Sequence, residues 1–120
     1  MRREVLFFGL LLATVVRAQG DPVNGEKRFE ECAACHSVER GKNGLGPSLH
    51  GIFERSAAGL EGFMYSPAMK RSKVKWTPQN LDEFVADPQK AVPANRMPYA
   101  GMPEAADRAD LIAYLLKATR

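Results

Sequence analysis

The sequence predicts a small all-α domain that follows a separate N-terminal segment. Apolar residues recur at the three- and four-residue spacing of helices, and no stretch alternates between apolar and polar residues as a strand does. Pairs of a capping residue and a proline mark the starts of several helices. With 120 residues, the chain holds at most one small domain.

Residues 1–18 have the composition of a secretory signal peptide. Met1–Arg3 is positively charged, residues 5–16 (VLFFGLLLATVV) are apolar, and Ala18 is a small residue of the kind that precedes a cleavage site. We expect cleavage after Ala18, which leaves a domain of residues 19–120 in the periplasm. The alternative is an uncleaved anchor, but the apolar run is short for a membrane span, and we expect no stable membrane insertion.

The expected domain is nearly neutral. The whole chain has 17 Lys and Arg and 14 Asp and Glu. Residues 1–18 contain three of the arginines and one glutamate, so 14 basic and 13 acidic residues stay, a net charge of +1. Proteins that bind nucleic acid need a basic stripe, and we therefore expect no nucleic-acid partner.

Four helices are expected along this domain. Three start at the pairs Asp21-Pro22, Ser66-Pro67 and Thr77-Pro78, and the last carries an apolar stripe at helical spacing, Leu111, Ile112, Leu115 and Leu116. The predicted ranges are 22–34, 67–72, 78–87 and 104–118.

Two long loops separate these helices. Residues 37–62 contain six glycines and Pro47, more than a helix tolerates. Residues 88–103 contain four prolines, which leaves room for one helical turn at most.

Cys32-Ala33-Ala34-Cys35-His36 is the most informative motif. Cys-x-x-Cys-His is the attachment signature of c-type haem: two thiols one helical turn apart can add to the two vinyl groups on one porphyrin edge. The following histidine, His36, can then bind the iron. We therefore expect one haem, held covalently through Cys32 and Cys35.

Three other uses of these cysteines are less suitable. A redox-active pair would need a βαβ setting, which the sequence lacks. A structural zinc site needs four ligands, and His36 and His50 are the remaining candidates. An exported protein could also join its cysteines in a disulfide, but thioether bonds to haem explain both of them better.

The chain resembles the class I cytochromes c, in particular the bacterial soluble carriers related to cytochrome c2 and mitochondrial cytochrome c. The resemblance covers Gly25 to Ala118. It rests on the segments GEKRFEECAACHSVE, GPSLHGIFER, YSPAMKRSKVKW, NRMPYAGM and RADLIAYLLKAT. It implies the cytochrome c fold, in which short helices and loops wrap around one covalently bound haem.

The resemblance also implies roles for single residues. The carbonyl of Pro47 would accept a hydrogen bond from the proximal ligand His36, and Met97 would be the sixth ligand of the iron. Residues that would bind the haem propionates are Arg55, Tyr65 and Trp76. On the residues alone, a loop methionine is as often core as ligand. The competing methionines are Met64, Met69 and Met102, and His50 offers a bis-histidine alternative.

Several positions depart from the family pattern. Phe84 stands where a tyrosine is common and Met69 where an asparagine is common, so the wall near Met97 is less polar. The ring of lysines around the haem edge is also thinned: Lys90 and Arg96 stay, while other rim positions hold Glu31, Gln89 and Glu104.

The function that the resemblance implies is one-electron transport, without catalysis. The expected partners are redox proteins of a respiratory or photosynthetic chain: a membrane-bound reductase, and an oxidase or reaction centre. The protein would be a soluble monomer. The alternative is a haem peroxidase-type enzyme or an electron-entry module for an enzyme, which would need an open iron position and acid–base groups beside it.

Overall fold

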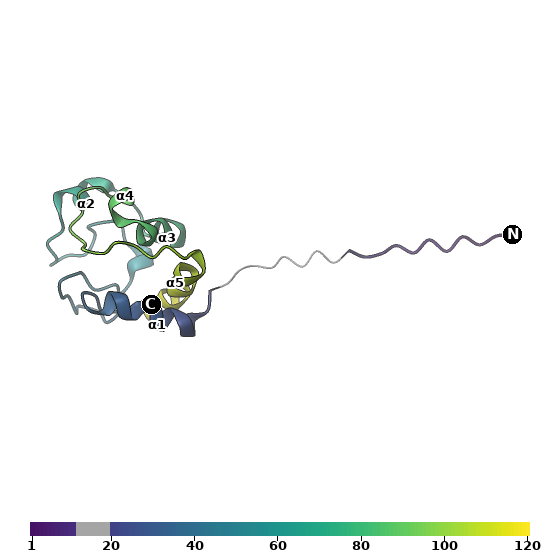
Figure 1. Ribbon diagram of the computed structural model, residues 1–120, viewed down its shortest axis with the longest axis horizontal. Coiled ribbons are helices and arrows are strands. Elements are labelled where there is room, and N and C mark those ends of the chain that lie inside the picture. Colours follow the sequence, from purple (N-terminus) through teal and green to yellow (C-terminus); the bar gives the residue numbers. More distant parts are fainter. Residues whose placement is uncertain (12–19) are drawn as a thin grey trace.

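The protein is all-α in the computed structural model, which describes residues 1–11 and 20–120 (Figure 1). Its helices are α1 (Pro22–Ala33), α2 (Pro67–Ser72), α3 (Pro78–Ala86), α4 (Pro88–Ala91) and α5 (Ala105–Ala118), with a 3₁₀ turn η1 (Ile52–Glu54). The extended pairing in the described ranges is one isolated bridge between Ser56 and Lys75. The predicted fold class is confirmed.

The N-terminal segment is described only in part. Residues 1–11 have no regular secondary structure, and the expected cleavage site after Ala18 lies outside the described residues. Among the residues that the structure describes, no helix is both long and apolar enough to cross a membrane.

Four of the five α-helices begin with the same N-capping arrangement. A capping side chain accepts the backbone N–H of a residue two or three positions later, at 2.9–3.2 Å, and proline occupies the first turn. The capping residues are Asp21, Ser66, Thr77 and Asp87. The fourth pair, Asp87-Pro88, starts α4, which fills the single turn for which the loop of residues 88–103 had room.

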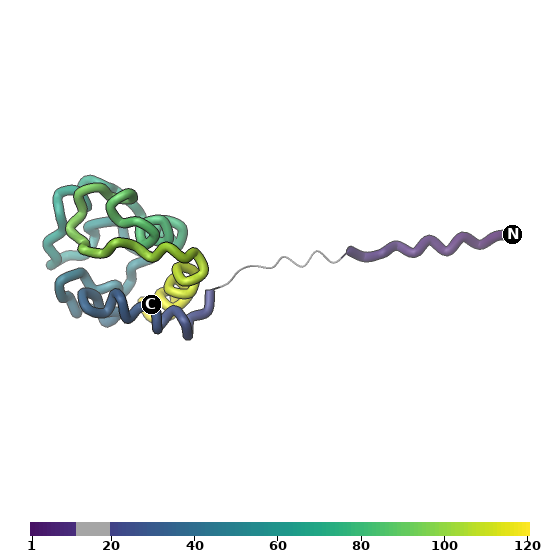
Figure 2. Tube along the Cα trace, in the orientation of Figure 1, coloured from purple at the N-terminus to yellow at the C-terminus, as the bar shows by residue number. Residues whose placement is uncertain are grey.

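Helices α1 and α5 cross in close contact (Figures 1 and 2), and Gly25 of α1 lies against the backbone of α5. A Cβ atom at residue 25 would collide with the backbone carbonyl of Asp110 and with the side chain of Tyr114. One turn further along, the ring of Phe29 packs on that of Tyr114 with centroids 5.5 Å apart. The glycine therefore lets two helix backbones touch, and the aromatic pair fixes their register.

A carboxylate ties the start of α1 to the same part of α5. Asp110 accepts the backbone N–H of Asp21 at 2.7 Å and the side-chain amide of Asn24 at 2.6 Å. These hydrogen bonds lower the pKa of the Asp110 carboxyl. When folding lowers the pKa of a carboxyl, its ionised form stabilises the folded state at a pH above the pKa of the unfolded state. This stabilisation is lost as the pH falls through the pKa of the folded state. The contact of Asp110 with α1 therefore weakens in acid.

The remaining helices pack above this crossing. Helix α3 lies against α5, where the Arg108 guanidinium pairs with Asp82 at 2.8 Å. Ahead of α3, Trp76 packs edge-on against Phe84 with ring centroids 5.0 Å apart. The tube in Figure 2 shows the loops between the helices curving around a central space, with α2 and α4 at the far side from the crossing.

The close approach of α1 and α5 can be tested with Gly25→Ala. In a helix, this change should stabilise by about 1 kcal/mol through propensity. Here we expect it to lower the free energy of unfolding by about 1–3 kcal/mol, because the new methyl group meets backbone that cannot move aside. Denaturant unfolding measures the difference. Glu26→Ala, at an exposed neighbouring position, should change stability by less than about 0.5 kcal/mol; a stabilised Gly25→Ala would contradict the interpretation.

Candidate functional site

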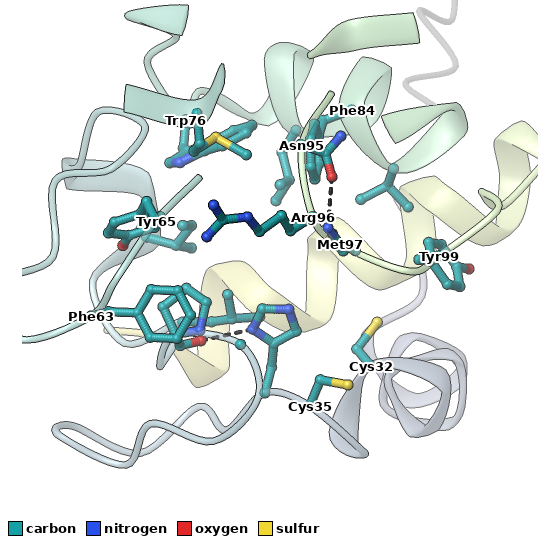
Figure 3. A pocket seen from close by; sticks show the side chains of 18 of the residues that line it. Cys32, Cys35, Phe63, Tyr65, Trp76, Phe84, Asn95, Arg96, Met97 and Tyr99 are labelled. Carbon is teal, nitrogen blue, oxygen red and sulfur yellow. Dashed lines mark hydrogen bonds between the residues drawn. The ribbon is translucent and has the colours of Figure 1, made fainter. Parts of the chain in front are cut away.

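A cavity of about 440 Å³ lies between the end of α1, the loops and helices α3 and α5 (Figure 3). This volume is in the range of cofactor pockets. Its walls are mostly apolar. They include Leu49, Ile52, Phe63, Trp76, Leu81, Phe84, Val85, Leu111 and Leu115.

The end of α1 places both cysteines at this cavity. Their sulfurs face it from one side (Figure 3), and the backbone N–H groups of Cys35 and His36 bond to the carbonyl of Cys32 at 3.1 and 2.9 Å. Burial, with Glu31 and Cys35 nearby, raises the pKa of Cys32 to about 11. Redox-active pairs need the opposite shift, so this site does not suit thiol–disulfide chemistry.

A zinc centre does not fit either. Among residues 1–11 and 20–120, no group of three His, Cys, Asp or Glu side chains could hold a metal ion, whereas a structural zinc ion needs four ligands. His50, the other candidate ligand, does not line the cavity. Its Nε2 lies 3.3 Å from the Arg40 guanidinium instead.

His36 lines the cavity, and its ring is fixed by a hydrogen bond. Its Nδ1 lies 2.7 Å from the carbonyl oxygen of Pro47, so Nδ1–H is the donor, and in the neutral ring Nε2 carries the free lone pair. Burial lowers the pKa of the imidazole; the Pro47 hydrogen bond opposes this and the charge of Arg55 adds to it. A Cβ atom at Gly46 would collide with the ring. Gly46 thus makes room for the ligand, a role the sequence did not reveal.

Met97 lines the cavity from the loop that follows α4, and two of the competing methionines are less well placed. Met102 is 4% exposed and lies in the core outside the cavity, where its N–H bonds to the carbonyl of Val85 at 2.8 Å. Met64 and Met69 reach the cavity, but Met64 is 82% exposed. Phe84 and Met69 also line it, which gives the less polar wall that the sequence predicted.

Asn95 holds the backbone of the Met97 loop. Its side chain is buried and fully hydrogen-bonded: Nδ2 donates to the carbonyls of Pro88 and Val92 at 2.9 Å each, and Oδ1 accepts the N–H of Met97 at 2.8 Å (Figure 3). Gln89 adds two more bonds, to the backbone of residues 94 and 95. The sequence analysis missed Asn95, because its burial and its hydrogen-bond partners arise only in the folded chain.

The opposite wall can accept an anionic group. The Arg55 guanidinium donates from Nη2 to the carbonyl of Ser48 at 2.7 Å, whereas its buried Nε has no hydrogen-bond partner among the described residues. Burial lowers the pKa of this guanidinium. Tyr65 and Trp76 line the same wall (Figure 3). A buried donor without a partner is costly, and an anion placed here would satisfy it.

These features together fit haem. The cavity presents two thiols, a neutral imidazole with a free Nε2, a thioether, apolar walls and a buried guanidinium donor. In haem, the thiols would meet the vinyl groups, and the imidazole and the thioether would meet the iron. The apolar walls would contact the flat ring, and the guanidinium would pair with the propionates. Arg96 extends into the cavity from the Met97 loop (Figure 3) and is exposed.

Comparison with known proteins gives a consistent result. The profile of the family described as cytochrome c matches residues 22–119. Cytochrome c2 of Rhodoblastus acidophilus is 47% identical over 97 residues, which are 80% of this chain and 91% of that protein. Cytochrome c2 of Blastochloris viridis is 39% identical over 117 residues, 96% of this chain and 92% of that protein.

A longer relative is also similar. The cytochrome c-type cyt cy of Rhodobacter capsulatus is 48% identical over 97 residues, which are 80% of this chain and 48% of that protein. The chain thus spans about half the length of that relative. From the family profile, the relatives and the Cys32–His36 motif at its cavity, we conclude that the chain belongs to the cytochrome c family and binds one haem c covalently through Cys32 and Cys35.

Proposed function

We propose that this cytochrome is a soluble, exported monomer that carries single electrons between redox proteins of a respiratory or photosynthetic chain. Its donor would be a membrane-bound reductase and its acceptor an oxidase or a reaction centre. Members of this family are electron carriers and not enzymes. The observation that carries the proposal is that one cavity is lined by two complementary ligands, His36 and Met97.

His36 and Met97 are the two residues that would bind the haem iron. When bound, haem supplies one-electron chemistry, and histidine–methionine ligation favours the ferrous state. Nε2 of His36 is the free nitrogen because Nδ1 is bonded to Pro47. The Met97 backbone is held by Asn95. Protein hydrogen bonds thus hold both residues in place, which suits a carrier.

The cavity supports a carrier better than a peroxidase. Peroxidase chemistry requires an acid–base group beside an open iron position. Among the described cavity-lining residues, Glu31 is the single carboxylate, and its Oε2 already accepts the phenol O–H of Tyr99 at 2.7 Å. Met97 would occupy the position that a peroxidase leaves open.

We assign Arg55, Tyr65 and Trp76 to the haem propionates. Arg55 has a buried Nε without a partner, and the other two side chains offer a phenol and an indole donor on the same wall. The arginine would neutralise one carboxylate in a half-buried site, where an unpaired charge is unfavourable.

The Met97 assignment can be tested by spectroscopy. The ferric protein should show the weak far-red charge-transfer band of methionine–iron ligation, and Met97→Ala should abolish this band because it removes the thioether. Met102→Ala is the matched control. It should keep the band, since Met102 lies in the core. If Met102→Ala loses the band and Met97→Ala retains it, the assignment is wrong.

The role of Asn95 in the Met97 loop is tested by Asn95→Ala. This change leaves two carbonyls and the N–H of Met97 with fewer partners, and each unsatisfied group costs about 1–3 kcal/mol. The far-red band should disappear at a lower urea concentration than global helix unfolding. Asn80→Ala removes an amide that donates to a carbonyl at the start of α3, away from this loop. In Asn80→Ala, the far-red band and the helices should be lost at the same urea concentration. If they are also lost together in Asn95→Ala, Asn95 does not hold the Met97 loop.

Export can be tested by the mass of the mature protein. In a host that matures c-type cytochromes, the protein from the periplasm should have the mass of residues 19–120 plus one haem. Replacing Ala18 by a bulky residue should block processing, because signal peptidases require small side chains. A purified protein that retains residues 1–18 would instead support an uncleaved anchor.

A further inference from the structure

A hydrogen bond between Tyr99 and Glu31 joins the Met97 loop to α1. The Tyr99 hydroxyl donates to Oε2 of Glu31 at 2.7 Å, across 68 positions of sequence. Tyr99 follows Met97 by two residues, and Glu31 directly precedes Cys32. Both side chains line the cavity. The bond therefore connects the segment that carries the proposed axial methionine to the helix end that carries the haem attachment site.

The two ends of the Met97 loop are held by other contacts. Upstream, Asn95 and Gln89 tie the loop to α4. Downstream, Met102 bonds through its N–H to Val85, and its carbonyl accepts a hydrogen bond from Arg108. In the described part of the chain, residues 98–101 form no hydrogen bond to another element apart from that of the Tyr99 side chain, although Gly101 packs against the backbone of Ala86.

The chemistry of this pair favours a strong hydrogen bond. Among the described residues, Glu31 forms no ion pair, so its carboxylate is available to the phenol. A hydrogen bond to an ionised acceptor is about twice as strong as a neutral one. Tyr99 is half-buried and packs against the core, so the tyrosine gives up little freedom on binding Glu31.

We infer that the Tyr99–Glu31 bond is a latch that positions Met97 by holding residues 98–101 against α1. Tyr99 and Glu31 are positioning residues, since they act through the loop backbone: the N–H of Tyr99 bonds to the carbonyl of Met97 at 2.9 Å. The inference rests on the proposed function in one respect, that Met97 is the ligand being positioned. It also explains why an acidic residue stands next to Cys32, where lysine was expected from the resemblance.

The experiment compares Tyr99→Phe, Glu31→Gln and the double variant in the haem-loaded ferric protein. Two readouts are used: the urea dependence of the far-red band, and amide hydrogen exchange of residues 96–101. Tyr99→Phe removes one oxygen atom and should raise the opening constant of the loop about ten-fold, which corresponds to about 1.4 kcal/mol. Glu31→Gln retains an acceptor without the charge, and should raise it by a smaller factor.

The double variant separates a latch from two independent effects. If the two side chains act through one bond, the double variant should open no more than Tyr99→Phe alone. Matched controls are Tyr114→Phe, which removes a hydroxyl on α5, and Glu30→Gln, which neutralises the neighbouring exposed acid on α1. In both controls, the opening constant of the loop should stay within two-fold of its value in the unmodified protein.

The outcomes distinguish the latch from the proposed function. If the unmodified protein lacks the far-red band, Met97 is not the ligand, and hydrogen exchange alone decides whether the loop is latched. If the band is present but Tyr99→Phe stays within two-fold in both readouts, there is no latch. If the effects of Tyr99→Phe and Glu31→Gln on the opening constant add fully in the double variant, the two side chains act independently and there is no latch.

Discussion

The close approach of α1 and α5 at Gly25 is the constraint on which the rest of this structure depends. It fixes the direction of α1, and the end of α1 carries Cys32, Cys35 and then His36. It also fixes α5, which presents Leu111 and Leu115 to the cavity. If the helices were held apart by even one methyl group, the attachment site and the opposite apolar wall would both be displaced.

The Met97 loop depends on a different kind of interaction. Its upstream end is held by a buried amide with three hydrogen bonds, which is rigid because water cannot compete for those groups. Its downstream end meets α3 and α5 at the backbone of Met102. Met97, the proposed ligand, is therefore placed by protein contacts that do not involve the metal, and preorganisation of this kind limits rearrangement during reaction.

Local signals in the sequence predicted most of the helices and the attachment motif. Cap–proline pairs predicted the starts of three helices, and the same signal at Asp87-Pro88 also marks α4. The Cys-x-x-Cys-His motif predicted covalent attachment of haem, because the residues that this chemistry needs are adjacent in the sequence. Asn95, Gly46 and the Tyr99–Glu31 bond could not be read in this way, because each acts on groups that only the folded chain brings together. Met97 required the resemblance, since a loop methionine has no local signature of ligation.

The prolines that start four helices act on the unfolded chain as well as on the folded one. Each restricts its own φ and disfavours the helical region for the residue before it, so the unfolded chain has fewer conformations to lose on folding. A compatible proline contributes about 0.4–1 kcal/mol in this way without any new contact. A domain with short helices has little core to stabilise it. In this protein, part of the free energy of unfolding therefore arises because the prolines restrict the conformations of the unfolded chain. A list of the contacts in the folded protein would not include this contribution.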